Sequence, residues 1–223
     1  MITLASDFGS PYPASMKGVV RRETDAEIID LTHDLPRGDP RAAAFWLRFL
    51  VPEFPPAVHC AVVDPGVGTD RAAIAVQAGS HVLVAPDNGL AIPPARALTA
   101  ADGVEADGST GADDRSTPQA YRIAVDDPAS ATFHGRDVFA PAAATIREAL
   151  GRVDALGDPA ATADVLGSLP SLTRTDAVVE LTLPEPDVER TGTAAADDGD
   201  AEATGDVTAV DGTVLVVDDF GNA

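Results

Sequence analysis

Cysteine is almost absent from this sequence of 223 residues: Cys60 is the only one, which excludes an internal disulfide bond. It stands in the apolar run 58–63, where a buried and unreactive thiol is expected. No run of 18 apolar residues occurs, so the sequence predicts no membrane-spanning helix. The N-terminal segment lacks the charged region and the apolar core of a signal peptide, and we therefore expect a cytoplasmic protein.

Basic residues are also scarce. The chain has 15 lysines and arginines against 36 acidic residues, a net charge of -21, and Lys17 is its only lysine. Such a surface repels nucleic acid and anionic membranes, so neither is an expected partner. Because carboxylates repel one another unless salt screens them, the composition indicates a host with high internal salt. Aromatic residues make up 4%, but a hydrophobic content of 45% is enough for a packed core.

Several signature motifs are missing. The sequence has no GxxxxGK[ST] loop, no GxSxG turn, and no HExxH or CxxC spacing, which disfavours nucleotide-phosphate binding, serine-hydrolase chemistry and a compact metal site. Asp64 and His134 are residue types that could share a metal ion. A metal site stays an alternative on residue type alone, and we predict none.

Apolar runs alternate with helical patterns over residues 1–150, which predicts an α/β fold with a mostly parallel sheet. Expected strands are 2–5, 28–34, 58–63, 73–76, 81–85, 178–183 and 214–217; expected helices are 15–22, 41–50 and 138–150. Residues 1–155 form the predicted N-terminal α/β catalytic domain, and 156–176 a linker. Residues 177–223 form a partial C-terminal β domain with an acidic low-complexity insertion at 185–206.

The stretch 60–71, CAVVDPGVGTDR, organises the chain. A buried strand ends there at Asp64 and a Pro/Gly turn, and other expected strands also end in polar residues: Asp7, His33, Asp34, Asp87 and Asn88. The carboxyl ends of parallel strands meet at one edge of a sheet, where ligands bind. With Arg71, His134 and Arg136, this edge would hold groups able to polarise a water molecule or bind a cationic small molecule. The alternative for Asp64 is a solvated turn residue.

Seven strings in order resemble one family: SDFG at 6–9, MKG at 16–18, DLTHDLP at 30–36, VVDPGVGTDR at 62–71, APDNG at 85–89, FHGRDVFAPAAA at 133–144 and DDFGN at 218–222. The family is the S-adenosyl-L-methionine (SAM) hydroxide adenosyltransferases, relatives of fluorinase and chlorinase. The resemblance implies an N-terminal α/β domain, a small C-terminal β-barrel, and a homotrimer with active sites between subunits. It also implies hydrolysis of SAM to adenosine and L-methionine without metal or cofactor.

The resemblance assigns roles to single residues. Asp64, Arg71 and His134 match the set that positions or activates water, and Asp7 matches the carboxylate that binds the ribose hydroxyls. Asp218 and Asn222 match contacts to the methionine end and to adenine, and Phe220 matches a pocket wall.

The sequence differs from the related halogenases at two positions and from the usual family pattern in two segments, and each difference predicts something about function. The halogenases have a hydroxyl residue in place of Gly135 and lack the equivalent of Asp64. These two differences favour water over a halide ion as the nucleophile. The loop 10–15 is short and without an acidic residue, which would weaken recognition of methionine. Family members continue past FGN, so we expect the barrel to be truncated. The alternative from another functional class is a protein that binds SAM or adenosine without catalysing a reaction.

Overall fold

The computed structural model describes residues 1–223 except 102–116, 126–128, 131, 186, 192–205 and 218–223. Two compact units divide the chain, Met1–Thr182 and Leu183–Ala223, and each is described by itself. No helix in the described ranges is long and apolar enough to cross a membrane.

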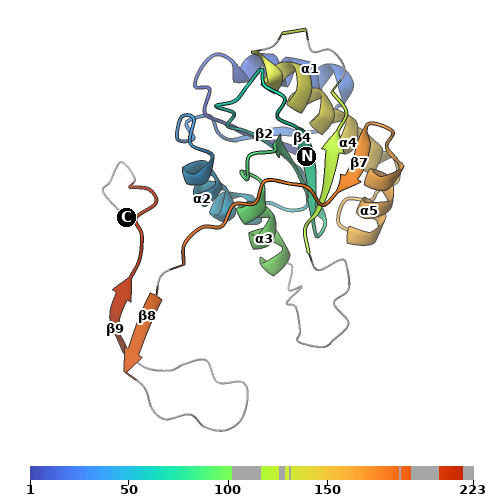
Figure 1. Ribbon diagram of the computed structural model, residues 1–223. Helices are drawn as coiled ribbons and strands as arrows, with labels where there is room; N and C mark the ends of the chain where they lie inside the picture. The colour runs from blue at the N-terminus through green and yellow to red at the C-terminus, as the bar shows by residue number, and fades with distance from the viewer. Residues whose placement is uncertain (102–116, 126–128, 131, 186, 192–205, 218–223) are drawn as a thin grey trace. The chain divides into compact units, whose positions relative to one another are not determined.

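The first unit is built on a seven-stranded sheet with the strand order β2-β1-β3-β5-β4-β6-β7 (Figure 1). The strands are β1 (Ile2–Ser6), β2 (Ile28–Thr32), β3 (Val58–Val62), β4 (Ala73–Ala78), β5 (His81–Pro86), β6 (Gln119–Ile123) and β7 (Leu172–Thr175). Strands β2, β1, β3 and β5 are parallel to their neighbours in this order, whereas β4, β6 and β7 pair antiparallel.

The sheet is therefore mixed, where the sequence predicts a mostly parallel one. The reason lies in the connection from β4 to β5, which has only the two residues Gly79 and Ser80. Two residues allow a hairpin but are too few for the crossover that parallel strands need. Gly79 has a φ of 57°, the left-handed conformation that such tight turns favour.

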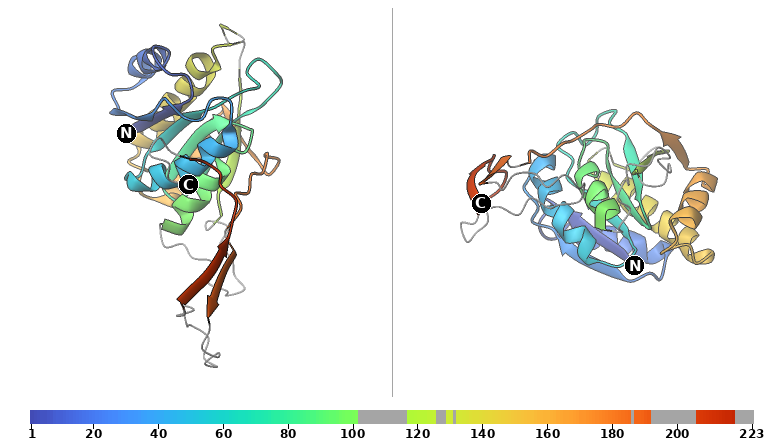
Figure 2. Two further views of the ribbon diagram at one scale, coloured as in Figure 1. Left: turned by 90° about the vertical axis from the view of Figure 1, so that its left-hand side faces the viewer. Right: turned by 90° about the horizontal axis from the view of Figure 1, so that it is seen from below.

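Helices cover both faces of the sheet (Figures 1 and 2). Helices α1 (Pro13–Glu23), α4 (Ala140–Arg152) and α5 (Pro159–Ser168) pack on one face, and α2 (Pro40–Leu50) and α3 (Ile92–Ala101) pack on the other. Short helical turns lie at Val51–Glu53 and, in π-helical form, at Gly135–Phe139 directly before α4. Asp39 caps α2 and Asp158 caps α5, each accepting two backbone N–H groups ahead of a proline.

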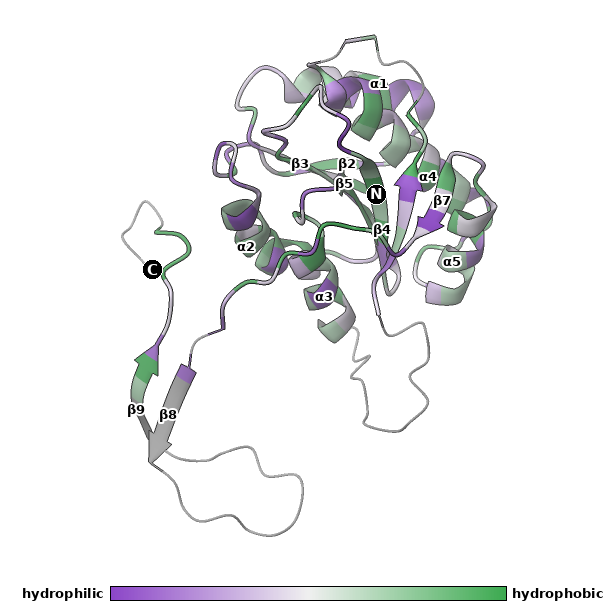
Figure 3. Cartoon of the chain, in the orientation of Figure 1, coloured by the Kyte–Doolittle hydropathy of each residue, from purple (hydrophilic) through white to green (hydrophobic). Residues whose placement is uncertain are grey.

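The central strands are buried on both sides. Cys60 and Val62 of β3 pack against the layer of α1 and α4, whereas the alternate residues Ala61 and Val63 pack against α2 and α3. Burial on both faces explains why these strands read as continuous apolar runs rather than alternating ones. Helices α1 and α2 each carry hydrophobic and hydrophilic residues, as expected for helices that cover a sheet (Figure 3).

Three expectations for the chain after residue 150 differ from the structure. Residues 156–176, predicted to be a linker, contain α5 and the edge strand β7, whose buried Leu166 and Leu172 belong to the core. The predicted strand 178–183 has no regular secondary structure, and side chains bind its backbone at two points: Asp87 accepts the Val179 N–H at 2.7 Å, and Arg96 donates to the Leu181 carbonyl at 3.4 Å. Residues 212–217, which include the predicted strand 214–217, are likewise irregular.

In the second unit, β8 (Asp187–Thr191) and β9 (Asp206–Asp211) form an antiparallel two-stranded sheet. This hairpin is the regular structure of the described residues 183–185, 187–191 and 206–217. The expected β-barrel therefore remains a prediction, and most of the expected insertion at 185–206 lies outside the described residues.

Candidate active site

Asp64 lies two residues after Val62, the last residue of β3, at the carboxyl end of the sheet. Its side chain is only 6% exposed and forms an ion pair with Arg71, the residue that closes the same turn. The backbone N–H of Gly66 donates a second hydrogen bond to the same carboxylate oxygen, Oδ1, at 3.1 Å. The carboxylate is thus held by a guanidinium and a backbone amide from its own loop, which fixes its direction.

Two features hold this loop in place. Gly66 lies against the Arg71 guanidinium so closely that a Cβ at this position would be 2.6 Å from Arg71 Cζ. From the neighbouring strand, the Asn88 side-chain amide donates to the Val63 carbonyl at 2.8 Å. Asn88, predicted at the polar edge, therefore acts on the site by tying the end of β5 to the end of β3.

His134 comes to the same place from a distant part of the chain, at the start of the π-helical turn. A pocket of about 790 Å³ is lined by the three predicted catalytic residues Asp64, Arg71 and His134. Arg122 of β6 and Thr173 of β7 also line it, so the pocket reaches from the loop after β3 to these two antiparallel strands. The structure thus brings together the three residues that the sequence placed in one constellation.

Asp7 lies beyond the end of β1 and is not among the residues described as lining this pocket. Its Oδ2 accepts the backbone N–H of Gly38 at 2.8 Å. A carboxylate offers about four acceptor positions, so this bond leaves capacity for further donors. The other predicted substrate contacts, Asp218, Phe220 and Asn222, lie outside the described residues.

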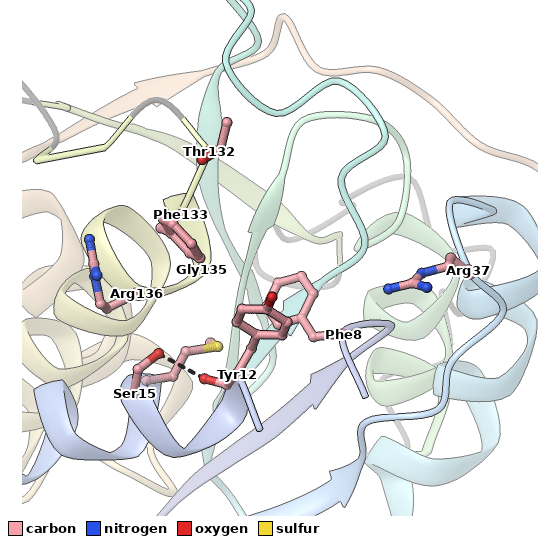
Figure 4. Close-up of a pocket in the computed structure, with 9 residues that line it drawn as sticks. Phe8, Tyr12, Ser15, Arg37, Thr132, Phe133, Gly135 and Arg136 are labelled. Atoms are coloured by element: carbon pink, nitrogen blue, oxygen red, sulfur yellow. Dashed lines mark hydrogen bonds between the residues drawn. The ribbon is translucent and has the colours of Figure 1, made fainter. Parts of the chain in front are cut away.

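A second pocket of about 270 Å³ is lined by residues from the start of α1 and from the segment 132–136 (Figure 4). Phe133 and Gly135, the two neighbours of His134, line it together with Phe8 and Tyr12. The rings of Tyr12 and Phe133 have their centroids 6.1 Å apart. Residues 133–135 thus contribute to both pockets: His134 lines the first, and Phe133 and Gly135 line the second.

Arginines flank this second pocket. Arg136 stacks over the Phe133 ring, with Cζ 5.1 Å from the centroid, and pairs with Asp137 through two hydrogen bonds. The hydrogen bonds from Arg136 lower the pKa of the Asp137 carboxyl and outweigh the opposing effect of its burial. Phe8 and Tyr12 are not among the predicted site residues; in a chain with 4% aromatics, two aromatic residues so near Asp7 were the available signal.

Metal ligands do not gather in the described part of the chain: no group of three or more His, Cys, Asp or Glu side chains is placed to hold an ion. His59 of β3 and His81 of β5 lie within the sheet and hydrogen-bond to each other at 2.9 Å.

Comparison with known proteins supplies the family. Residues 2–157 match the SAM hydroxide adenosyltransferase N-terminal domain. A protein of Salinispora arenicola named (R)-S-adenosyl-L-methionine hydrolase is 45% identical over 173 residues, which cover 76% of this chain and 61% of that protein. A protein of the same name from Methanocaldococcus jannaschii is 36% identical over 154 residues, covering 66% and 52% respectively.

A solved structure has a similar fold. It is that of an uncharacterized conserved protein from Thermotoga maritima, which superposes with a TM-score of 0.63 at 29% identity, covering 89% of this chain and 68% of that one. The present chain spans 61% of the length of the Salinispora arenicola relative. The match over residues 2–157 covers more than half of the chain, and the chain therefore belongs to the SAM hydroxide adenosyltransferase family.

Proposed function

We propose that this protein hydrolyses SAM to adenosine and L-methionine by attack of water on the ribose C5′ atom. The observation that carries the proposal is the single pocket lined by Asp64, Arg71 and His134. The relatives from Salinispora arenicola and Methanocaldococcus jannaschii, both named for SAM hydrolysis, support it.

The chemistry sets a limited demand on the protein. Water forms a bond to C5′ while the C5′–S bond breaks, and its electron pair returns to sulfur. The leaving group is then a neutral thioether, methionine, which needs no acid to depart. The protein must instead hold the water in line with the C5′–S bond, exclude competing solvent and accept one proton.

Each residue of the pocket fits a part of this demand. Asp64 and His134 accept hydrogen bonds from the attacking water, and Arg71 stabilises the negative charge that develops on its oxygen. Because Arg71 already pairs with Asp64, one ion pair would orient both groups toward the water. Transfer of the proton to a positioned base contributes about 10²- to 10⁴-fold to the rate.

The substrate's other groups require contacts outside this pocket. Asp7 would bind the ribose 2′ and 3′ hydroxyls through the acceptor positions that Gly38 leaves open. Asp218 and Asn222 would contact the methionine end and the adenine, and Phe220 would form a wall. We further propose a homotrimer whose sites combine the N-terminal domain of one subunit, residues 1–155, with the C-terminal β domain of the next. The reaction would use neither metal nor cofactor.

The test is turnover of SAM by the full chain in molar KCl, with and without a chelator, followed by chromatography of the products. We expect equal amounts of adenosine and methionine, unchanged by the chelator. Loss of activity with the chelator would indicate a metal-dependent hydrolase. Formation of 5′-chloro-5′-deoxyadenosine from the chloride present would indicate a halogenase. Binding of SAM without any product would indicate a non-catalytic binding protein.

A further inference from the structure

The loop after β2 contacts the loop after β1 at several points around Asp7. Strands β1 and β2 are parallel neighbours, so their carboxyl ends lie together. The backbone N–H of Gly9 donates to the His33 carbonyl at 2.9 Å, and that of Leu35 donates to the Ser6 carbonyl at 3.1 Å. With the bond from Gly38 to the Asp7 carboxylate, residues 33–38 hold the segment 6–9 on both sides of Asp7.

A chain of side-chain hydrogen bonds runs through the same place. The Ser6 hydroxyl lies 2.8 Å from Nδ1 of His33, whose Nε2 lies 3.1 Å from Oδ1 of Asp30. The other oxygen of Asp30 pairs with Lys17, the only lysine of the chain. Burial acts to raise the pKa of Asp30, but the hydrogen bonds from Lys17 and His33 outweigh it and lower this pKa, so the carboxylate stays charged.

These partners determine the direction of each bond. A charged carboxylate only accepts, so Nε2 of His33 carries the proton that points to Asp30. When the imidazole carries this one proton, Nδ1 is the acceptor and the Ser6 hydroxyl donates to it. Ser6 is fully buried at the last position of β1, so its hydroxyl cannot turn to water instead.

The buried Ser6 also rules out a nucleophilic role. A serine, a histidine and an aspartate in hydrogen-bond contact resemble a hydrolase triad, but a nucleophile must be able to reach a substrate. The bonds instead join the residue before Asp7 to a charged pair on α1 and β2. We propose that His33 is a positioning residue: through Ser6, it sets the direction in which the Asp7 carboxylate meets the ribose hydroxyls.

This inference rests on the role proposed for Asp7 in substrate binding. It differs from a purely structural role of His33 in one measurable respect. If His33 acts through Asp7, its loss must weaken ligands that carry the ribose 2′ and 3′ hydroxyls more than ligands that lack them. A general loosening of the fold would weaken both kinds of ligand alike.

The experiment compares the affinity of the full chain for adenosine and for 2′,3′-dideoxyadenosine by calorimetry. His33→Phe keeps a ring but no hydrogen bond. In this variant we expect adenosine to bind about tenfold more weakly, because the ribose hydroxyls lose hydrogen bonds to the charged Asp7 carboxylate. The affinity for dideoxyadenosine should change less than about twofold. Asp25→Asn, at an exposed position between α1 and β2, is the control and should change neither affinity.

Two conservative variants keep the test decisive if His33→Phe does not fold. An asparagine amide reaches the position of Nδ1, and a glutamine amide reaches that of Nε2. His33→Asn keeps the bond to Ser6 and should retain the preference for adenosine, whereas His33→Gln keeps only the bond to Asp30 and should lose it. Equal preference in both variants would overturn the role of His33.

The wild-type protein separates this inference from the function on which it rests. If the wild type does not distinguish adenosine from dideoxyadenosine, the role of Asp7 fails and the inference fails with it. If the wild type distinguishes them and His33→Phe does so to the same extent, only the role of His33 fails.

Discussion

The guanidinium of Arg71 lies against the backbone of Gly66, so that a Cβ on Gly66 would come within 2.6 Å of Arg71 Cζ. The same guanidinium pairs with Asp64, and the Gly66 N–H donates to that carboxylate. Glycine at position 66 is therefore a condition for the ion pair as the structure has it. A side chain there would displace one of the two charged groups that line the pocket.

The first prediction concerns this contact. Gly66→Ala should push Arg71 away from Asp64 and lower the rate of SAM hydrolysis by about 10²-fold, the loss expected when a reacting group is misplaced by about 1 Å. The melting temperature should change little, because the loop is at the surface. The control is Gly167→Ala in α5, where a Cβ meets nothing within 4 Å and full activity is expected. Equal activity of the two variants would contradict the role of the ion pair.

The second prediction concerns Asp64 itself. Asp64→Asn keeps the size of the side chain and an acceptor for the Gly66 N–H, but removes the charge and the proton acceptor. We expect the fold to persist, because Arg71 is 27% exposed and can be solvated, and the turnover number to fall by about 10²- to 10⁴-fold. Asp25→Asn, at an exposed position, serves as the control. Wild-type turnover in Asp64→Asn would remove this residue from the mechanism.

The third prediction concerns the buried histidine pair in the sheet. His59 hydrogen-bonds to Thr3 and His81, and burial, helped by the nearby His81, lowers its pKa to about 3. Above pH 6.5 neither the folded nor the unfolded state protonates this residue. Between pH 6.5 and about 3 the unfolded state binds a proton that the folded state excludes, so stability falls as the pH falls.

The comparison that isolates this effect is with His59→Gln, which can hydrogen-bond but cannot be protonated. Urea unfolding at pH 7 and pH 5 should show a larger loss of unfolding free energy in the wild type than in the variant. Carboxylates titrate in both proteins and cancel in the difference. The same loss in both would mean that His59 is protonated in the folded state.

The fourth prediction follows from the net charge of -21. Repulsion between surface carboxylates destabilises the folded state, and molar salt shortens the screening length to about 3 Å. The melting temperature should therefore rise between dilute buffer and molar KCl; a gain of about 2 kcal/mol would raise it by roughly 4–8 °C. A melting temperature that is independent of KCl concentration would show that this net charge does not destabilise the folded state.

The sequence predicts those elements whose signal is local. The strand that ends at Asp64 is recognisable because an apolar run meets a Pro/Gly turn, and helix 41–50 because its aromatic and aliphatic residues follow a helical period. Helix α3 begins with Ile92 and two prolines and carries no strong period, and β6 is a short edge-side strand of mixed polarity. Neither has a local signal strong enough to predict it.

Arrangement in space is less accessible than the elements. Alternation of strands and helices predicts a mostly parallel sheet, but the two-residue turn at Gly79 reverses β4, which therefore pairs antiparallel with both β5 and β6. Segment 178–183 has the composition of a strand, yet its Val179 N–H donates to the Asp87 side chain and not to a neighbouring strand. Such outcomes depend on partners that are distant in the sequence, which a local pattern does not identify.

The candidate site likewise combines a contact within one loop, which the sequence predicts, with contacts between distant segments. Asp64 and Arg71 are seven residues apart in one loop, so their proximity follows from the turn. His134 joins them only through the packing of α4 on the sheet, a contact between segments that are distant in the sequence. The contact between Ser6 and His33 was not predicted, because it depends on the register of two strands whose ends are 27 residues apart.

The measurement that tests the central claim most directly is hydrolysis of SAM in H₂¹⁸O, followed by mass spectrometry of both products. Attack of water on C5′ predicts one ¹⁸O atom in the 5′-hydroxyl of adenosine and none in methionine, in the wild type and in whatever residual product Asp64→Asn forms. Adenosine without ¹⁸O, or label in the amino-acid product, would show that water does not attack C5′ and would contradict the mechanism built on Asp64, Arg71 and His134.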